Sequence, residues 1–149
     1  MADSTKASGF RALASFIQPV FASFPLKLMF MNVQFDLKKE YELPSTFVPK
    51  SGGVYTVSAN AAFNPENLTK NNLVILSIHV NDILVATNNE LFVSGMGTLI
   101  IEVNTIIQLK AKDRVEVFIL ALDNGRVFPA SSSSSFMTSF QAIRSPSPL

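Results

Sequence analysis

The chain contains no cysteine and a single histidine among its 149 residues. Without cysteine it cannot form a disulfide framework, a thiolate zinc site or a cysteine nucleophile. One histidine is also too few for a histidine-rich metal site. These absences exclude several classes of enzyme and metalloprotein before any motif is considered.

Charged residues are scarce as well. They make up 15% of the chain, compared with about 25% in ordinary domains, and 12 basic residues nearly balance 11 acidic ones. This balance excludes the basic footprint of a nucleic-acid-binding protein. Because 48% of the residues are hydrophobic, including 13 phenylalanines, we expect identical subunits to cover part of the surface. A well-filled core behind a Ser/Thr/Asn-rich exterior is the alternative.

Long apolar runs are missing too. Prolines and polar residues interrupt the hydrophobic segment 10–31, so each uninterrupted apolar run is shorter than the roughly 20 residues that a membrane-spanning helix needs. The first ten residues, MADSTKASGF, lack the basic region and apolar run of a secretory signal. We therefore expect no membrane span and no signal peptide, and the length fits one domain.

What the chain does contain is one β-strand pattern after another, with no helical segment. Apolar and polar residues alternate, with turn signals between the runs, in segments 53–63, 73–80, 83–87, 98–109, 114–122 and 135–143. Segment 10–31 adds two short strands. Asn81-Asp82 predicts a tight hairpin, and Asn124-Gly125 is a strong turn signal. The pattern indicates an all-β sandwich or barrel.

Six residues stand in the order F-x5-D-x4-Y-x5-F-x5-G-x-Y: Phe30, Asp36, Tyr41, Phe47, Gly53 and Tyr55. This order resembles the signature of the globular heads of the first complement component, subcomponent q, which belong to the tumour-necrosis-factor-like jelly-roll superfamily. The segments LKAKDRVEVF (109–118) and SFMTSF (135–140) resemble two further stretches of such heads. Lys112 and Ser139 stand where the family usually has glycine. The segment STFVPKSGGVY resembles the stand-alone bacterial versions of the head.

The resemblance implies a ten-stranded jelly-roll β-sandwich that assembles as a homotrimer. It divides the chain into a flexible N-terminus (1–8), the head (9–143) and a C-terminal tail (144–149). It also implies a non-enzymatic structural or recognition head on a bacterial cell or spore surface, which presents loops for multivalent contact with a protein or a glycan. The candidate contact loops are 64–72, 88–97 and 123–134.

The resemblance also suggests roles for individual residues. The candidate core or signature residues are Phe30, Phe47, Gly53, Phe136 and Phe140. We expect Gly53 to permit a backbone conformation or a close approach that a side chain would block. We expect Tyr55 to pack inward with its hydroxyl bonded.

The implied trimer has an apolar threefold axis. Alternate residues of two predicted strands are our candidates for lining it: Tyr55, Val57, Val117 and Ile119. The sequence itself does not show which face of these strands meets a partner.

The remaining polar residues carry little catalytic signal. A Ser–His–Asp arrangement using His79 and Asp82 is formally open, but His79 lies two residues before a turn and nothing resembles a nucleophile elbow. We therefore expect no catalytic residue and no cofactor. Calcium is a minority expectation, because some relatives bind it, and oxygen ligands are offered by Asp82, Asn88, Asn89 and Glu90. Turn formation is the favoured explanation of these residues, so no metal ligand is named.

Two alternative functions share this architecture. A viral or phage fibre tip would use the same trimeric geometry to bind a receptor. A jelly-roll enzyme acting on sugars would need a pocket of convergent titratable groups, which one histidine and no cysteine make a weaker interpretation.

Overall fold

The computed structural model of the protein describes residues 7–129 and 137–146, which form thirteen strands and no helix. The strands are β1 (Gly9–Leu13), β2 (Gln18–Val20), β3 (Leu26–Lys27), β4 (Asn32–Asp36), β5 (Tyr41–Glu42), β6 (Thr46–Phe47), β7 (Gly53–Pro65), β8 (Asn72–Val80), β9 (Ile83–Phe92), β10 (Leu99–Leu109), β11 (Val115–Ala121), β12 (Gly125–Phe128) and β13 (Ser139–Arg144). Ten of them are three residues or longer. Within the described ranges, no helix has the length and apolarity needed to cross a bilayer.

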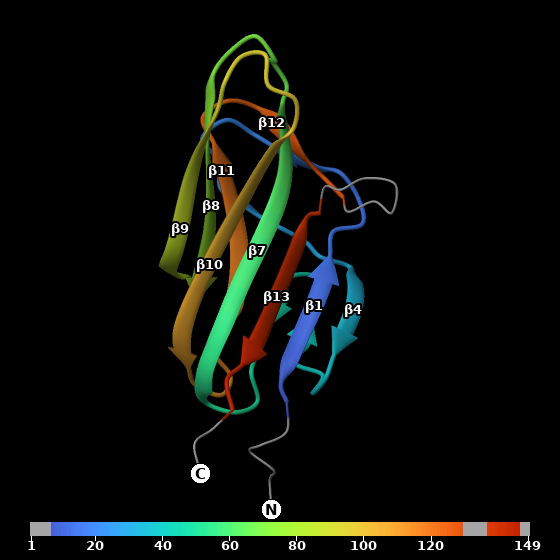
Figure 1. Ribbon diagram of the computed structural model, residues 1–149, viewed down its shortest axis with the longest axis vertical. Helices are drawn as coiled ribbons and strands as arrows, with labels where there is room; N and C mark the ends of the chain where they lie inside the picture. The colour runs from blue at the N-terminus through green and yellow to red at the C-terminus, as the bar shows by residue number, and fades with distance from the viewer. Residues whose placement is uncertain (1–6, 130–136, 147–149) are drawn as a thin grey trace, which may run out of the picture.

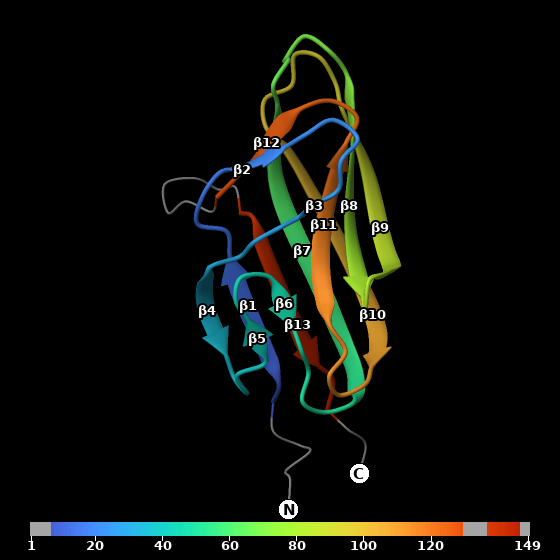
Figure 2. The same ribbon diagram turned by 180° about the vertical axis from the view of Figure 1, so that it is seen from behind.

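Two antiparallel sheets face each other as a sandwich (Figure 1). In the seven-stranded sheet, the long strand β7 pairs with β10 along one side and with β13 and β12 along the other. β13 continues to β1 and β4, and β12 continues to β2. The six-stranded sheet, seen from its own side in Figure 2, runs β5-β6-β11-β8-β9, with β3 added beside β11. This arrangement is the expected jelly-roll sandwich.

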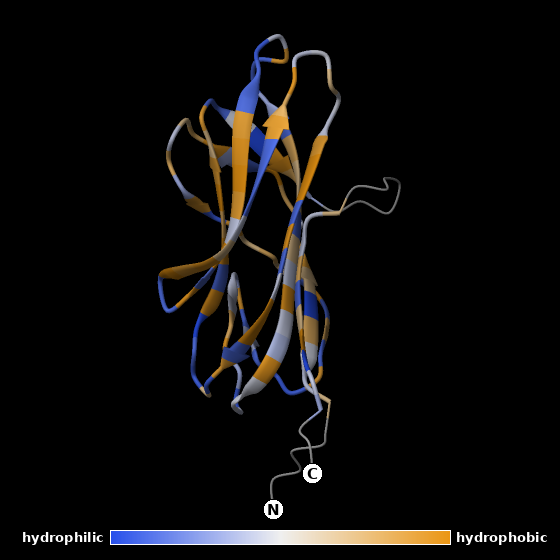
Figure 3. Cartoon of the chain, turned by 60° about the vertical axis from the view of Figure 1, so that its left-hand side comes forward, coloured by the Kyte–Doolittle hydropathy of each residue, from blue (hydrophilic) through white to orange (hydrophobic). Residues whose placement is uncertain are grey.

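The long strands alternate between two environments. In β7, Tyr55, Val57 and Ala59 are fully buried, while their neighbours Thr56 and Ser58 face outward. This alternation follows from the two-residue period of a strand, which sends successive side chains to opposite faces of a sheet. Apolar and polar bands accordingly follow one another along the strands in Figure 3. The core therefore lies between the sheets.

Aromatic rings fill one end of this core. The ring of Phe10 stacks on Tyr41 and Phe47, with centroid distances of 4.9 and 4.8 Å. It also meets Phe140 edge-on at 4.9 Å. Such ring pairs contribute roughly 0.5–1.5 kcal/mol beyond the area that they bury. Because Phe10 and Phe140 come from the larger sheet and the other two rings from the smaller one, this cluster joins the layers.

The two predicted turns have different outcomes. Asn81 and Asp82 connect β8 to β9 with φ values of 51° and 68°, as a hairpin with two left-handed residues requires. Asn124-Gly125 follows a bend at residues 122–123 and leads into β12, which pairs with β2 and β7 and not with β11. The chain crosses there from the smaller sheet to the larger one. A Cβ on Gly125 would lie 2.3 Å from the Phe63 ring and 2.6 Å from the Asn64 carbonyl oxygen.

We expect Gly125→Ala to lower the free energy of unfolding by about 2–3 kcal/mol, because overpacking a site bounded by backbone forces a shift of β7. Chemical denaturation followed by circular dichroism measures this change. Gly97→Ala is the matched control, since a Cβ there meets nothing within 4 Å. Equal stability of the two variants would contradict the packing that we describe.

Lys112, which stands where the resembling heads usually have glycine, adopts a φ of 73°. A non-glycine residue in this left-handed region is disfavoured by roughly 1–2 kcal/mol. We therefore expect Lys112→Gly to stabilise the fold by about 0.5–1 kcal/mol, after the greater freedom of glycine in the unfolded chain is counted. Thermal unfolding tests this, with Lys110→Gly as the control that should lose stability. A loss of stability in both variants would refute it.

Candidate functional site

The four residues proposed for the trimer axis lie inside a single sandwich. Tyr55, Val57, Val117 and Ile119 are all fully buried within one chain. A side chain that is already enclosed by its own two sheets cannot line an axis between copies, so the choice of face is corrected. The alternation along the strands separated two sets of side chains, and the set that we chose lies in the core. The outward neighbours of Tyr55 and Val57, such as Thr56, lie on the outer surface of the seven-stranded sheet, whereas those of Val117 and Ile119 lie on the smaller sheet, where Glu116 is itself buried.

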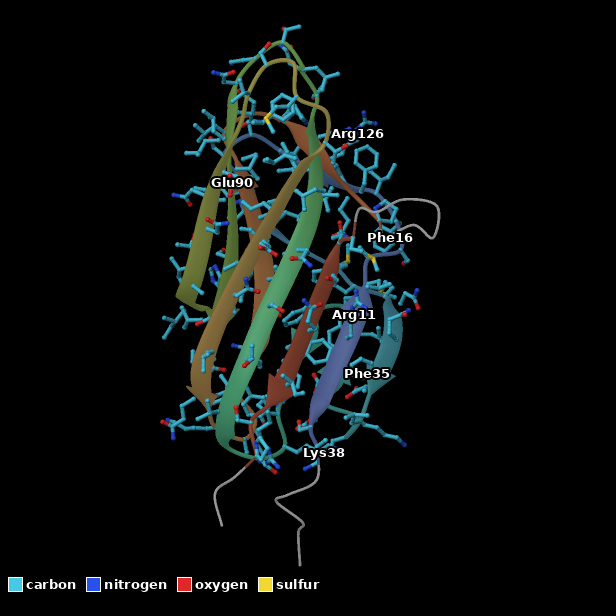
Figure 4. The ribbon with its side chains drawn as sticks, in the orientation of Figure 1. Arg11, Phe16, Phe35, Lys38, Glu90 and Arg126 are labelled. Carbon is cyan, nitrogen blue, oxygen red and sulfur yellow. The ribbon has the colours of Figure 1, made fainter. Side chains whose placement is uncertain are left out.

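The outer surface of the seven-stranded sheet carries an unusual number of exposed apolar side chains. We call this surface the apolar face; its exposed apolar members are Phe35, Leu37, Val54, Ile100, Ile106 and Ile143. Ile106 and Ile143 are 73% and 57% exposed and flank Thr56 across β10, β7 and β13. The face is turned toward the viewer in Figure 4, where Phe35 is labelled on β4 and Arg11 on β1. Glu102 and Asn104 separate Ile100 from Ile106 along β10, so these side chains form groups and not one continuous patch. Exposed apolar side chains gathered on one face favour an interaction site.

A shallow groove of about 230 Å³ lies on this face. Its lining includes the apolar side chains of Phe35, Leu37 and Ile143 and the smaller residues Gly9, Thr56 and Ser58. Ile106 projects from β10, which lies at the opposite edge of the same sheet from β4. The face therefore offers an apolar hollow near one edge and a protruding apolar side chain near the other.

Gln141 adds a polar element to the middle of the face. Its Nε2 donates a hydrogen bond of 2.7 Å to Ser58 Oγ. Its Oε1 is shielded from solvent and has no hydrogen-bond partner among the described residues. An acceptor that is shielded from water and has no hydrogen-bond partner costs free energy. A hydrogen-bond donor on the surface of a binding partner would remove this cost by pairing with Gln141 Oε1.

The acidic and aromatic signature residues organise the loop before β5. The carboxylate of Asp36 accepts hydrogen bonds of 2.9 Å from the backbone N–H groups of Glu40 and Tyr41. The Tyr41 hydroxyl lies 2.7 and 2.8 Å from the carbonyl oxygens of Phe30 and Pro44. Burial raises the pKa of Tyr41 well above its usual range, so this phenol remains a hydrogen-bond donor. Both residues therefore serve the fold.

Gly53 provides the close approach that the sequence predicts. A Cβ at this position would lie 2.9 Å from Cδ of Arg144, whose side chain is buried. The Tyr55 hydroxyl donates a 2.7 Å hydrogen bond to the Ser51 carbonyl oxygen. Nearby, the buried carboxylate of Glu40 accepts hydrogen bonds from Ser8 Oγ and the Lys50 N–H. This polar cluster closes the end of the sandwich where β1 begins and β13 ends.

The phenylalanines of the signature lie in the core. Phe30, Phe47 and Phe140 are fully buried, and Phe30 packs against Phe140 with a centroid distance of 5.5 Å. Phe136 lies outside the described residues, as do residues 1–6 of the expected flexible N-terminus and residues 147–149 of the tail.

His79 has ordinary structural partners. Its Nε2 lies 3.2 Å from Ser77 Oγ on the same strand, and its ring packs on Phe118 with a centroid distance of 4.4 Å. The carboxylate of Asp82, the third member of a formal triad, binds Arg114 at 3.0 Å instead. Ser77 is itself buried. The geometry therefore gives no exposed nucleophile oriented by a histidine and a free acid.

The calcium candidates do not converge. Asp82 is engaged by Arg114, and Asn88 Nδ2 donates to the Glu102 carbonyl oxygen. Over residues 7–129 and 137–146, no three His, Cys, Asp or Glu side chains gather closely enough to hold a metal ion. Calcium therefore remains an expectation from the resemblance without a named site.

The three predicted contact loops meet at one end of the sandwich, opposite to the start of β1 and the end of β13 (Figure 1). Asn71 Oδ1 accepts a hydrogen bond from the Ser94 N–H, which joins the first loop to the second. Lys70 Nζ lies 3.4 Å from Asp123 Oδ1, and this ion pair joins the first loop to the third. Parts of the predicted loops are strand, since β9 extends to Phe92 and β12 begins at Gly125; residues 130–134 lie outside the described residues.

Solved structures share this fold. A crystal structure of murine APRIL at pH 5.0 is similar with a TM-score of 0.66 and 12% sequence identity, over 94% of this chain and 100% of that one. The globular domain of zebrafish complement 1qA protein is similar with a TM-score of 0.57 and 13% identity, over 93% of this chain and 94% of that one. No family model and no curated protein matches the sequence.

These likenesses confirm the predicted fold, a jelly-roll β-sandwich like that of murine APRIL and of the globular domain of zebrafish complement 1qA protein. Because the sequence identities are 12% and 13%, the likeness concerns the architecture and carries no residue roles.

The environment of His79 predicts a dependence of stability on pH. Burial lowers the pKa of His79 below its ordinary value of about 6.5, and the charges of Asp82 and Glu116 offset this in part. The folded state therefore favours the neutral imidazole, and its contribution to stability is present above pH 6.5 and is lost as the pH falls below that value. We expect His79→Gln to lose less unfolding free energy than the wild type between pH 7 and pH 5.

Urea denaturation at several pH values measures this difference. Ser77→Ala, which keeps the imidazole, serves as the control and should retain the pH dependence. If the free energy of unfolding changed with pH in the same way for the wild type and His79→Gln, this histidine would have the same pKa in the folded and unfolded chains, which would contradict the prediction.

Proposed function

We propose that this protein is a non-enzymatic recognition head that assembles as a homotrimer through the apolar face. The assembled head presents three copies of the loop end to a protein or glycan, in a multivalent contact at a bacterial cell or spore surface, the setting that the sequence resemblance implies. The observation that carries the proposal is the exposed apolar outer surface of the seven-stranded sheet.

Self-association explains the composition of that surface. Leaving side chains as large as Ile106, Ile143 and Phe35 in water forgoes roughly 1.5–3 kcal/mol for each one that could be fully buried. The jelly-roll fold supports the same conclusion, since the resemblance implies a trimer for heads of this kind. Few charges lie elsewhere in the chain to offset such exposure.

The positions of the hollow and the protrusion favour a ring. The groove lies toward β4 and Ile106 lies on β10, so a copy that places its Ile106 in its neighbour's groove uses two different patches. Such a contact between unlike patches is heterologous, and it generates a closed ring when the rotation between copies divides a full turn. A threefold rotation satisfies this condition and leaves no unfilled groove.

A non-enzymatic role is supported by the partners of the polar side chains. His79 is held by Ser77 and Phe118, Asp82 by Arg114, and Glu40 by Ser8 and Lys50. These three groups, each able to act as an acid or a base, are thereby engaged in the fold.

Light scattering coupled to gel filtration tests the assembly. At micromolar concentration we expect a mass of three times the 16.3 kDa chain. Ile143→Glu or Ile106→Glu should give a folded single chain, because a carboxylate enclosed in an apolar contact weakens association by at least about 1,000-fold, or roughly 4 kcal/mol.

Ile83→Glu is the matched control, since Ile83 is also highly exposed but starts β9 in the other sheet. It should keep the mass of the wild type. A wild-type mass of one chain, or a folded trimer carrying Ile143→Glu, would reject the proposed assembly.

A further inference from the structure

Two phenylalanine side chains are exposed to solvent on a turn close to the loop end, which is the end of the sandwich where the three predicted contact loops meet. Phe21 and Phe24 are 63% and 69% exposed and stand at the two ends of the turn 21–24, which is closed by a 3.1 Å hydrogen bond between them. We call this segment the aromatic turn. Phenyl groups on a flexible loop would pack onto the nearest apolar surface. Their exposure therefore implies that the backbone of the turn is held in place.

Hydrogen bonds to the rest of the fold supply that cause. The Ser23 N–H donates to the Ala121 carbonyl oxygen at 2.7 Å, and the Ala22 N–H donates to Asn124 Oδ1 at 2.7 Å. Ser23 adopts a φ of 59°, which reverses the chain tightly. The rings are therefore presented by a backbone that is fixed in advance, so binding would not have to order it.

The aromatic turn borders a surface hollow in two adjacent parts. The first part, of about 380 Å³, is lined by Phe21, Pro19, Val20, Glu66, Asn124, Gly125 and Arg126. The second part, of about 490 Å³, is lined by Glu66, Asn67, Leu68, Lys70, Asp123 and Asn124. Glu66 and Asn124 line both parts, which therefore lie side by side, and we call the two together the loop-end trough. Arg126 projects at this end in Figure 4.

Several polar groups of the trough lack partners in the part of the chain that the structure describes. The Glu66 carboxylate has no hydrogen bond or ion pair there, although Arg126 lines the same hollow. The guanidinium of Arg126 lies over the Phe128 ring, 5.9 Å from its centroid, and no carboxylate binds it. Asn67 and Asn124 use their Oδ1 atoms within the fold, which leaves the Nδ2 donors for a ligand.

The charges of the trough cancel. Glu66 and Asp123 are balanced by Lys70 and Arg126, so the trough has no net field that would attract a polyanion or a polycation. A ligand suited to it is electrically neutral, carries both hydrogen-bond donors and acceptors, and has one apolar surface for the exposed ring.

We propose that the loop-end trough binds a neutral saccharide, with one sugar ring lying against Phe21. A pyranose has a face of C–H groups that packs on an aromatic ring, and its rim of hydroxyls can each donate and accept hydrogen bonds. Glu66 accepts from one hydroxyl, and Asn67, Asn124 and Arg126 donate to others. The inference rests on the proposed recognition function, whose ligand class and site it specifies.

Trimer assembly sets the strength of this interaction. A shallow, open trough gives weak binding to one sugar. Three identical troughs that engage one glycan surface raise the apparent affinity by about 10²–10⁴-fold without any new contact. Binding to a dense glycan surface therefore depends on assembly, whereas binding of a single sugar to one trough does not.

The full-length chain is first tested on a printed array of neutral hexose and N-acetylhexosamine oligosaccharides beside sialylated and sulfated ones. The best neutral saccharide is then titrated as its monovalent methyl glycoside, with binding followed by two-dimensional NMR. We expect array binding to neutral saccharides, and shifts in the amide signals of residues 21–24, 66–67 and 124–126. Phe21→Ala and Glu66→Gln should each weaken binding by at least 10-fold.

The matched controls are Phe16→Ala and Glu90→Gln, which remove an exposed phenyl ring and an exposed carboxylate outside the trough. Figure 4 labels both positions away from Arg126. They should change binding by less than 2-fold. Circular dichroism confirms that each variant is folded.

Three outcomes would overturn the proposal: no saccharide binds, binding is confined to charged glycans, or the Phe21 and Glu66 variants bind like the wild type. Exposed phenyl rings that instead anchor a protein partner would give the first outcome. Light scattering on the same samples keeps the two proposals apart. A single chain that binds the methyl glycoside would reject the trimer and keep the trough, and a trimer that binds no sugar would do the reverse.

Discussion

The packing of Phe10 against Tyr41, Phe47 and Phe140 is the contact on which the sandwich depends. It brings rings from both sheets into one cluster, in a chain that has no cysteine with which to link its layers. Because interiors are packed as closely as organic crystals, this cluster fixes the distance and the angle between the sheets. The polar contacts of Asp36 and Glu40 then hold the short strands and loops that carry two of the four rings.

The sequence was sufficient to predict the fold because its signature residues are those whose packing the fold requires. Gly53 makes room for Arg144, and Tyr55 anchors its hydroxyl to Ser51. The same reasoning placed the trimer candidates on the wrong face. Alternation separates two sets of side chains in a strand, and we assigned the apolar set to the contact between copies instead of to the core. Comparison with Ser58 and Thr56, the polar outward neighbours of Val57, carried the missing signal.

The loop end was only partly predictable, for a different physical reason. The three loops were recognised from their turn residues, but their mutual contacts depend on sheet topology. Asn124-Gly125 shows this well, since its sequence indicates a turn but does not say that the turn carries the chain from one sheet to the other. That crossing places Asn124 beside the aromatic turn. No local pattern in segment 10–31 distinguishes the buried Phe30 from the exposed Phe21 and Phe24.

The start of β1 and the end of β13 lie side by side, joined by a 3.0 Å hydrogen bond from the Arg144 N–H to the Ser8 carbonyl oxygen. They meet at the far end of the molecule from the loops. A tether attached through either of these strand ends would thus leave from the same pole. Immobilising the protein on a sensor or a bead by one end, or by the other, would orient the loops outward in both cases.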